Sequence, residues 1–177
     1  MKYQFLATIL TTSAIATAAT TSLAQSERAN TANITCNLQT STPAIMATVS
    51  EQNDSKEVTM LSFLPQYFSP EAATETCQTT AKTLQSLYND GRMKYLSSST
   101  LNGQSTVCAV ETRGFVCDSN NPQTQILFSF QPDVNPSEAL YEMLGSQFKE
   151  ESSSQPHSTR TVSRIYSDFQ PRSWWPF

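Results

Sequence analysis

The chain has 177 residues, of which 38% are hydrophobic, and its 15 acidic and 11 basic side chains leave a net charge of −4. This length suits one domain with a modest core. Residues 25–151 carry 14 acids and 7 bases, a net charge of −7, whereas residues 152–177 carry three arginines and one acid, a net charge of +2. The negative charge of residues 25–151 would repel the phosphate backbone, which argues against nucleic acid as a partner of the domain.

The first 24 residues have the features of a secretory signal peptide. Lys2 provides a positive charge, residues 5–19 are weakly apolar without an acid, and Ser22-Leu23-Ala24 offers small residues to a signal peptidase. We expect cleavage after Ala24, which would place the protein in the periplasm or outside the cell. The alternative is a retained N-terminal anchor, although the apolar run is shorter than the roughly 20 residues that a spanning helix needs.

All four cysteines follow this signal, and an even number in an exported chain predicts two disulfides. They lack the Cys-x-x-Cys spacing of zinc or redox sites, and the only histidine, His157, lies in a serine-rich tail, so no metal site is expected. Four cysteines allow three connectivities. We favour Cys36–Cys77, which would join a strand to a helix, and Cys108–Cys117, which would join neighbouring strands; the other two connectivities stay open.

The N-terminal half of the domain is predicted to contain three strands and one helix. After a small, polar leader at residues 25–32, alternating apolar residues predict an antiparallel meander of strands at 33–40, 44–50 and 57–64. Ser69 is suited to cap a helix with Pro70 at its first position, and Gly91 is suited to end it. The apolar stripe of this helix consists of Ala73, Cys77, Ala81, Leu84, Leu87 and Tyr88.

The C-terminal half continues the sheet and adds a second helix. Asn102-Gly103 is a strong hairpin signal after a strand at 93–99, and further strands are expected up to residue 110, at 115–117 and at 125–130. Asn135 and Pro136 begin a helix whose predicted buried face is Ala139, Leu140, Met143, Leu144 and Phe148.

Together these elements predict an α+β domain at residues 33–148. We expect one antiparallel sheet of about five to seven strands, two helices and two disulfides. Residues 149–177 lack apolar periodicity until their aromatic end and are expected to form a disordered tail.

Several segments in this order resemble a known family. They are "ITCNL", "FLPQYFSPEAATETCQTTAKTLQSLYNDG", "MKYLSSSTLNGQSTVCAV", "CDSNNPQTQILFSFQP" and "NPSEALYEML". The chain thereby resembles the circadian oscillating protein family of cyanobacteria over residues 33–148. The resemblance implies an exported protein, or one associated with the membrane surface; the family name refers to rhythmic abundance and supplies no catalytic or binding residues.

The residues give little support to catalysis. Without a histidine the domain cannot form a Ser-His-Asp triad. A Ser-Lys pair of Lys94 with the serines at 97–99 is conceivable, but such residues are ordinary on a surface. A secreted hydrolase that uses loop carboxylates remains the alternative function; these acids are Glu51, Asp54, Glu57, Asp90, Asp118 and Asp133. No cofactor is expected, and "DSNN" at 118–121 lacks the spacing of a calcium loop.

Aromatic side chains are the best candidates for contact with a partner. Tyr67 and Phe68 precede the first helix and either pack in the core or flank a groove. Trp174 and Trp175 lie among the last four residues, close to Arg172. This tail would bind a membrane surface, bind an envelope protein or fold back on its own domain. The leading hypothesis is therefore a non-enzymatic binding or adaptor protein of the cyanobacterial envelope.

Overall fold

The computed structural model describes residues 31–51, 54–150 and 167–168. Within them, seven strands and three helices follow one another along the chain. The strands are β1 (Thr31–Asn37), β2 (Ala44–Glu51), β3 (Asp54–Ser62), β4 (Tyr95–Leu101), β5 (Gln104–Val110), β6 (Thr124–Ser129) and β7 (Ser167–Asp168). The helices are α1 (Pro70–Asn89), α2 (Pro136–Met143) and α3 (Ser146–Glu150).

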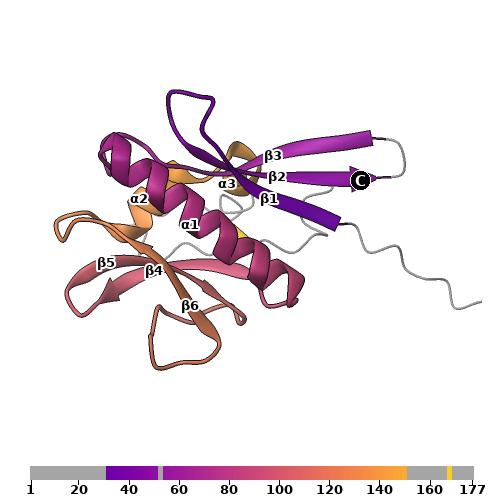
Figure 1. The fold of residues 1–177 in the computed structure, drawn as a ribbon. Coiled ribbons are helices and arrows are strands. Elements are labelled where there is room, and N and C mark those ends of the chain that lie inside the picture. Colours follow the sequence, from indigo (N-terminus) through magenta and orange to yellow (C-terminus); the bar gives the residue numbers. More distant parts are fainter. Residues whose placement is uncertain (1–30, 52–53, 151–166, 169–177) are drawn as a thin grey trace, which may run out of the picture.

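The strands form two antiparallel sheets (Figure 1). One contains β1, β2 and β3 in that order, and the other contains β6, β5, β4 and the two-residue β7. The predicted α+β class is confirmed, but the prediction of one sheet of five to seven strands with two helices is wrong, because the six long strands divide equally between two sheets and a third helix follows α2. Apolar alternation identifies which face of a strand is buried, but it does not identify the neighbouring strand.

Helix α1 forms where the sequence predicts and connects the two sheets. The Ser69 hydroxyl accepts a hydrogen bond from the Ala72 amide at 3.3 Å, and Pro70 occupies the first turn. Beyond the last turn Gly91 has a φ of 67°, a conformation that costs little without a Cβ. The buried stripe of the helix packs against β1 and β2 of the first sheet and against β6 of the second.

Side chains of α1 also cover the free edge of β1. The Gln85 side chain accepts a hydrogen bond from the Ile34 amide at 2.6 Å and donates one to the Ala32 carbonyl at 3.3 Å. The Tyr88 hydroxyl accepts from the Ala32 amide at 3.2 Å. An uncovered edge would offer these main-chain groups to a foreign strand, so the helix both fills the core and blocks edge-to-edge pairing.

The second sheet is built around a hairpin. Asn102 and Gly103 take φ values of 52° and 79° at its turn, as the sequence predicts, and β4 pairs with β5 from Tyr95 opposite Val110 to Leu101 opposite Gln104. The strand expected at 115–117 is absent: this segment belongs to the connection from β5 to β6. Its amides and carbonyls bond to side chains of β4 instead of a neighbouring strand.

The predicted second helix is interrupted at Gly145. Asn135 caps α2 by accepting hydrogen bonds from the amides of Ser137 and Glu138, as expected. Leu144 then forms a bridge with Leu61 of β3, and the Gly145 amide donates to the Met60 carbonyl at 3.0 Å. The buried face that the sequence assigned to one helix is thus shared between α2, the bridge and α3.

Both predicted disulfides are present, and all four cysteines are paired. Cys36–Cys77 joins β1 to α1, and Cys108–Cys117 joins β5 to the β5–β6 connection, with Cα atoms 5.6 Å apart in each. The second bond does not join neighbouring strands as expected, because Cys117 lies outside any strand. Loop-closure entropy gives contributions of about 4 and 3 kcal/mol, respectively.

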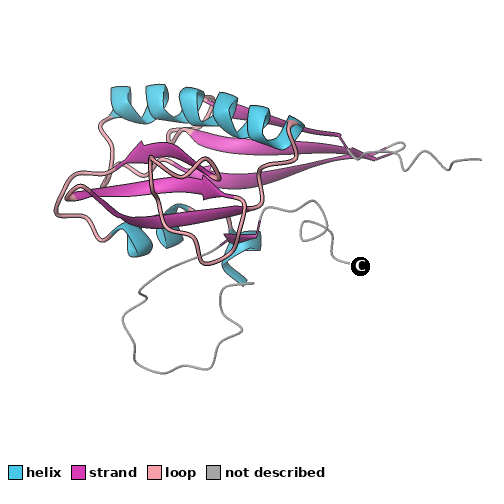
Figure 2. Cartoon of the chain, turned by 90° about the horizontal axis from the view of Figure 1, so that it is seen from below, coloured by secondary structure: helices cyan, strands magenta, loops and turns pink. Residues whose placement is uncertain are grey.

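One main core lies between the elements, and Figure 2 shows its layers. Helix α1 runs along one side of the strands, and α2 and α3 lie on the opposite side. Residues from both sheets and all three helices belong to this single cluster. A smaller cluster around the Cys108–Cys117 disulfide fills the other face of the second sheet.

The ends of the folded part differ from the expected domain limits. β1 begins at Thr31, so it includes two residues that the sequence assigned to the leader. Within the expected disordered tail, α3 extends to Glu150, and Ser167 and Asp168 pair with Leu96 and Tyr95 at the edge of β4. A two-residue strand has no periodicity to recognise; its pairing comes from the free edge that β4 offers.

We expect the substitution Gly145→Ala to destabilise the fold strongly. A Cβ atom at this position would lie 1.8 Å from the main-chain oxygen of Thr59, so the bridge to β3 would have to separate. The free energy of unfolding measured with urea should fall by about 2–4 kcal/mol. Ser146→Ala, at the exposed neighbouring residue, serves as the control and should change it by less than about 0.5 kcal/mol. Equal stabilities of the two variants would contradict this close contact.

Candidate functional site

The acids, cysteines and histidine considered for catalysis or metal binding are not brought together in the described part of the chain. Within this part no group of three or more histidine, cysteine, aspartate or glutamate side chains is placed to hold a metal ion. His157 lies outside the described part of the chain. None of the loop acids of the hydrolase hypothesis lines the cleft that the β1–β2 loop forms with the start of α1.

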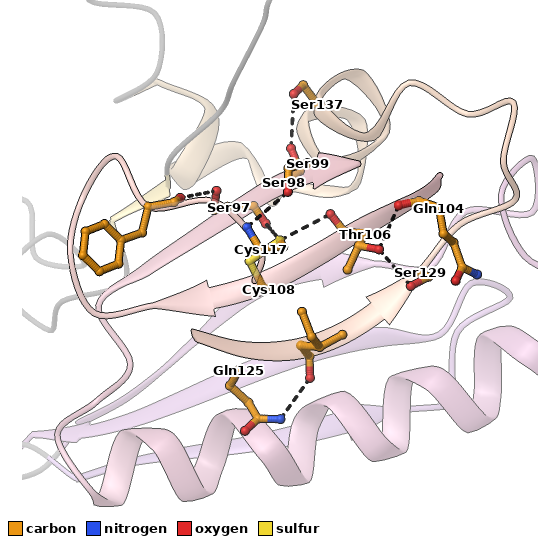
Figure 3. The surroundings of a disulfide bond; sticks show 12 residues. Ser97, Ser98, Ser99, Gln104, Thr106, Cys108, Cys117, Gln125, Ser129 and Ser137 are labelled. Carbon is orange, nitrogen blue, oxygen red and sulfur yellow. Dashed lines mark hydrogen bonds between the residues drawn. A yellow bond between two sulfur atoms is a disulfide. The ribbon is translucent and has the colours of Figure 1, made fainter. Parts of the chain in front are cut away.

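The serine-rich strand β4 has a structural role (Figure 3). The Ser97 hydroxyl donates to the Phe115 carbonyl at 2.9 Å, and Ser99 accepts from the Cys117 amide at 3.1 Å. On the opposite face, the Ser98 hydroxyl lies 3.2 Å from that of Ser137, which attaches α2. Hydrogen bonds from these serine side chains thus attach the β5–β6 connection and α2 to β4, where no main-chain pairing between strands is available.

The same contacts remove the basis for a Ser-Lys catalytic pair. Ser97 and Ser98 are buried, and the proton of Ser97 is committed to a carbonyl oxygen. Lys94 is exposed. A nucleophile must reach its substrate and give its proton to a base, and the burial of Ser97 and Ser98 is against the first of these conditions.

A concave site lies where the β1–β2 loop meets the start of α1. It is a cleft of about 200 Å³. Its floor is formed by the buried side chains of Phe63, Phe68 and Ala73. Its walls include three prolines, Pro43, Pro65 and Pro70, together with Leu38, which is 43% exposed.

The loop that forms one wall, residues 38–43, is held in place by its own hydrogen bonds. The Asn37 side chain accepts from the Gln39 amide at 2.8 Å, and the Thr40 hydroxyl donates to the Thr42 carbonyl at 2.7 Å. The Phe63 amide donates to the Pro43 carbonyl at 2.8 Å and anchors the loop to the end of β3. The cleft is therefore formed before any ligand arrives, which lowers the entropic cost of binding.

The lining of this cleft is neutral. Besides its apolar groups it contains the hydroxyl side chains of Thr40, Ser41, Thr42 and Thr74, and no ionisable side chain. An apolar cavity of about 150 Å³ is large enough to bind benzene. The cleft thus has room for one aromatic ring or one branched aliphatic group, with hydroxyl groups at its rim.

A shallow depression adjoins the cleft on α1 and shares Pro70 and Thr74 with it. Its remaining lining residues are Glu71, Glu75 and Gln78, all exposed. The two glutamates lie one helical turn apart, so their carboxylates point from the same face. An apolar cleft thereby borders an acidic surface.

The structure separates the two aromatic residues proposed as contacts. Phe68 is a core residue that also lines the cleft: its ring centroid lies 5.3 Å from that of Phe63 and 5.9 Å from that of Phe128. Tyr67 does not line the cleft; it is half-buried and packs against Phe130 at 5.5 Å. The other two proposed contacts, Trp174 and Trp175, lie outside the described residues.

Tyr67 joins the segment before α1 to the end of α2. Its hydroxyl donates to Oε2 of Glu142 at 2.6 Å, and the Gln66 amide donates to the same oxygen at 3.0 Å. Partial burial, together with the hydrogen bond to the Glu142 carboxylate, raises the pKa of Tyr67 to about 12. The hydrogen bond from Tyr67 in turn lowers the pKa of Glu142. A tyrosine that holds its proton so tightly serves as a donor and not as a base.

Reasoning from sequence missed Leu38 and the three prolines as parts of a site. The alternating pattern placed Leu38 on the apolar face of a strand at 33–40, but β1 ends at Asn37 and Leu38 is exposed in the loop that follows. The convergence of Leu38 and the prolines depends on the Cys36–Cys77 bond and the β3–α1 connection, which bring together segments about thirty residues apart.

We expect Ser97→Ala to loosen the β5–β6 connection without unfolding the domain. The Phe115 carbonyl would lose its donor, at a cost of about 1 kcal/mol. Trypsin should then cleave after the exposed Arg113 several times faster under native conditions. Thr100→Ala, at an exposed position of the same strand, is the control. An unchanged cleavage rate in Ser97→Ala would show that this hydrogen bond does not hold the loop.

The pair of Tyr67 and Glu142 predicts a pH dependence of stability at both ends of the pH range. Glu142 has a lowered pKa in the folded state, so its contribution is present above the ordinary pKa of 4.5 and is lost as the pH falls through the lowered value. Tyr67 has a raised pKa, so its contribution is present below 10 and is lost as the pH rises towards 12. Tyr67→Phe should therefore be less stable than the original protein at pH 7, and the difference should shrink below pH 4.5.

Ultraviolet titration of tyrosine provides a direct measurement. One tyrosine should ionise near pH 12, and Glu142→Gln should lower that value without restoring 10 fully, because burial remains. Glu138→Gln is the control, because the Glu138 carboxylate lies near Tyr67 but accepts no hydrogen bond from it; this variant should change the pKa of Tyr67 less than Glu142→Gln does. A Tyr67 that titrates near 10 in the original protein would contradict the hydrogen bond.

Within residues 31–150, no helix is long and apolar enough to cross a membrane. The two disulfides are typical of proteins in an oxidising compartment.

Searches of curated proteins and of solved structures found no match. A family model described as circadian oscillating protein COP23 matches residues 33–172, which includes the whole cleft and both disulfides. This match covers most of the chain and extends past the limit of 148 that the sequence resemblance suggested. The chain belongs to the circadian oscillating protein COP23 family.

Proposed function

We propose that this protein is an exported, non-enzymatic binding protein of the cyanobacterial envelope. It recognises a neutral apolar group in the cleft between the β1–β2 loop and the start of α1. The observation that carries this proposal is the lining of the cleft, which combines a floor of buried phenylalanines with a rim of hydroxyl groups and contains no ionisable side chain. Apolar walls with a few polar groups are the usual composition of ligand sites.

Export follows from the signal-like residues 1–24 and fits two disulfides that close within one domain. In this proposal the mature protein resides in the periplasm or outside the cell, where it associates with the surface of a membrane or with another envelope protein. Aromatic residues of the tail provide that contact.

The alternative, a secreted hydrolase, has less support. Hydrolysis of a glycosidic bond needs one carboxylic acid and one carboxylate that face each other across the substrate. The depression beside the cleft contains two acids, Glu71 and Glu75, and these lie side by side on one exposed helix face. Such an arrangement leaves no opposite wall for a substrate.

Titration with indole, a neutral ring that matches the volume of the cleft, tests the proposed site. We expect a dissociation constant on the order of 1 mM, and amide chemical shift changes confined to residues 38–43 and 63–74. Leu38→Ala should weaken binding about fivefold through the loss of apolar contact. Thr74→Arg should abolish it by filling the cleft.

Val116→Ala is the matched control, because Val116 is a similarly exposed aliphatic residue, 37% against 43% for Leu38, and does not line the cleft. It should bind indole like the original protein. Shift changes that lie elsewhere, or that persist unchanged in Leu38→Ala and Thr74→Arg, would refute the cleft as the binding site.

A further inference from the structure

The cleft and the acidic depression form one continuous surface with two different ends. Pro70 and Thr74 line both hollows, so the two adjoin at the first turn of α1. Among residues 31–51, 54–150 and 167–168, neither Glu71 nor Glu75 forms an ion pair. A ligand that fills the cleft with an apolar ring therefore meets two uncompensated carboxylates immediately beside it.

This arrangement selects an occupant that carries an aromatic group and a cation a few ångströms apart. A neutral ring alone would leave the carboxylates without a partner, and an acidic ligand would be repelled by them. The body as a whole has the same preference, because residues 25–151 carry 14 acids and 7 bases.

The C-terminal segment of this chain, "FQPRSWWPF", has this chemistry. Both tryptophans of the protein, Trp174 and Trp175, lie two and three residues after Arg172. In an extended chain this spacing corresponds to roughly 7–10 Å. One indole ring can thus enter the cleft while the guanidinium group lies over Glu71 and Glu75.

We propose that the cleft receives residues 169–177 of a second copy of this chain, so that the protein associates with itself through its tails. This inference depends on the cleft being the binding site proposed above. Of the two contacts proposed for the tail, a membrane surface and an envelope protein, it selects the protein and names it as a second copy of this chain.

The position of β7 favours a second copy over the tail of the same chain. β7 runs antiparallel to β4, and its last residue, Asp168, lies opposite Tyr95 at the start of β4. Thr74 and Asn89, on the helix that ends near β4, are about 22 Å apart along the axis. Trp174 and Trp175 can extend at most about 20–25 Å beyond Asp168, so a tail could reach the cleft of its own chain only when almost fully extended along this helix, whereas the tail of a second copy has no such restriction.

A segment of nine residues buries less surface than a stable dimer interface. We therefore expect weak association, with a dissociation constant on the order of 100 µM. Sedimentation velocity of the protein with both disulfides formed should show a concentration-dependent increase in mass between about 10 and 500 µM. Trp174→Ala/Trp175→Ala should remain monomeric over this range, and Val116→Ala should behave like the original protein.

Titration in trans separates the two parts of the proposal. A synthetic peptide of residues 166–177 is added to the Trp174→Ala/Trp175→Ala protein, whose cleft has no competing tail. We expect shift changes at residues 38–43 and 63–74, weaker binding by at least tenfold in Thr74→Arg, and about threefold to tenfold weaker binding in Glu71→Gln/Glu75→Gln at low salt. Glu57→Gln, on the exposed face of β3, is the charge control and should have no effect.

The outcomes distinguish this inference from the proposed function. Binding of indole without binding of the peptide would overturn self-association and leave the cleft as a binding site. Failure of both ligands would overturn both. Binding of the peptide with equal strength to Thr74→Arg would also overturn the inference. If the monomeric protein instead sediments with liposomes through Trp174 and Trp175, the tail binds a membrane surface and the inference is wrong.

Discussion

The bond between Cys36 and Cys77 is the constraint on which most of this structure depends. It attaches an edge strand to the middle of the longest helix, and the side chains of Gln85 and Tyr88 extend that attachment along the strand. The same bond positions the loop after β1 beside the first turns of α1, which is where the cleft forms. A small domain with a modest core gains from such a crosslink because the core alone stabilises it only marginally.

The two faces of the second sheet show how the chain uses buried polar residues. Serine hydroxyls on β4 bond to carbonyl and amide groups of segments that have no strand to pair with. Each bond stabilises the fold by a modest amount, but an unpaired buried group would cost more, so these contacts determine where the β5–β6 connection and α2 lie. A stretch that resembles a nucleophile-rich site is thus part of the scaffold.

The floor of the cleft belongs to the core as much as to the site. Phe63 and Phe68 contact Phe128 edge to face, and these contacts fix the shape of the hollow above them. A site built on core side chains is rigid, whereas its rim of threonines, serine and an exposed leucine can vary without loss of the fold. Recognition and stability therefore depend on different atoms of the same few segments.

The sequence by itself determined the local structure, namely the caps of α1 and α2 and the Asn102-Gly103 turn, and it favoured the family and one of three cysteine pairings. These features depend on residues close together in the chain, or on the few ways of pairing four cysteines. Only the tertiary structure decided the division into two sheets, the break at Gly145 and the cleft, because each depends on which distant segments come into contact. Periodicity predicts a buried face, but Leu38, Pro43 and Pro70 form a wall only after β1, β3 and α1 have packed together.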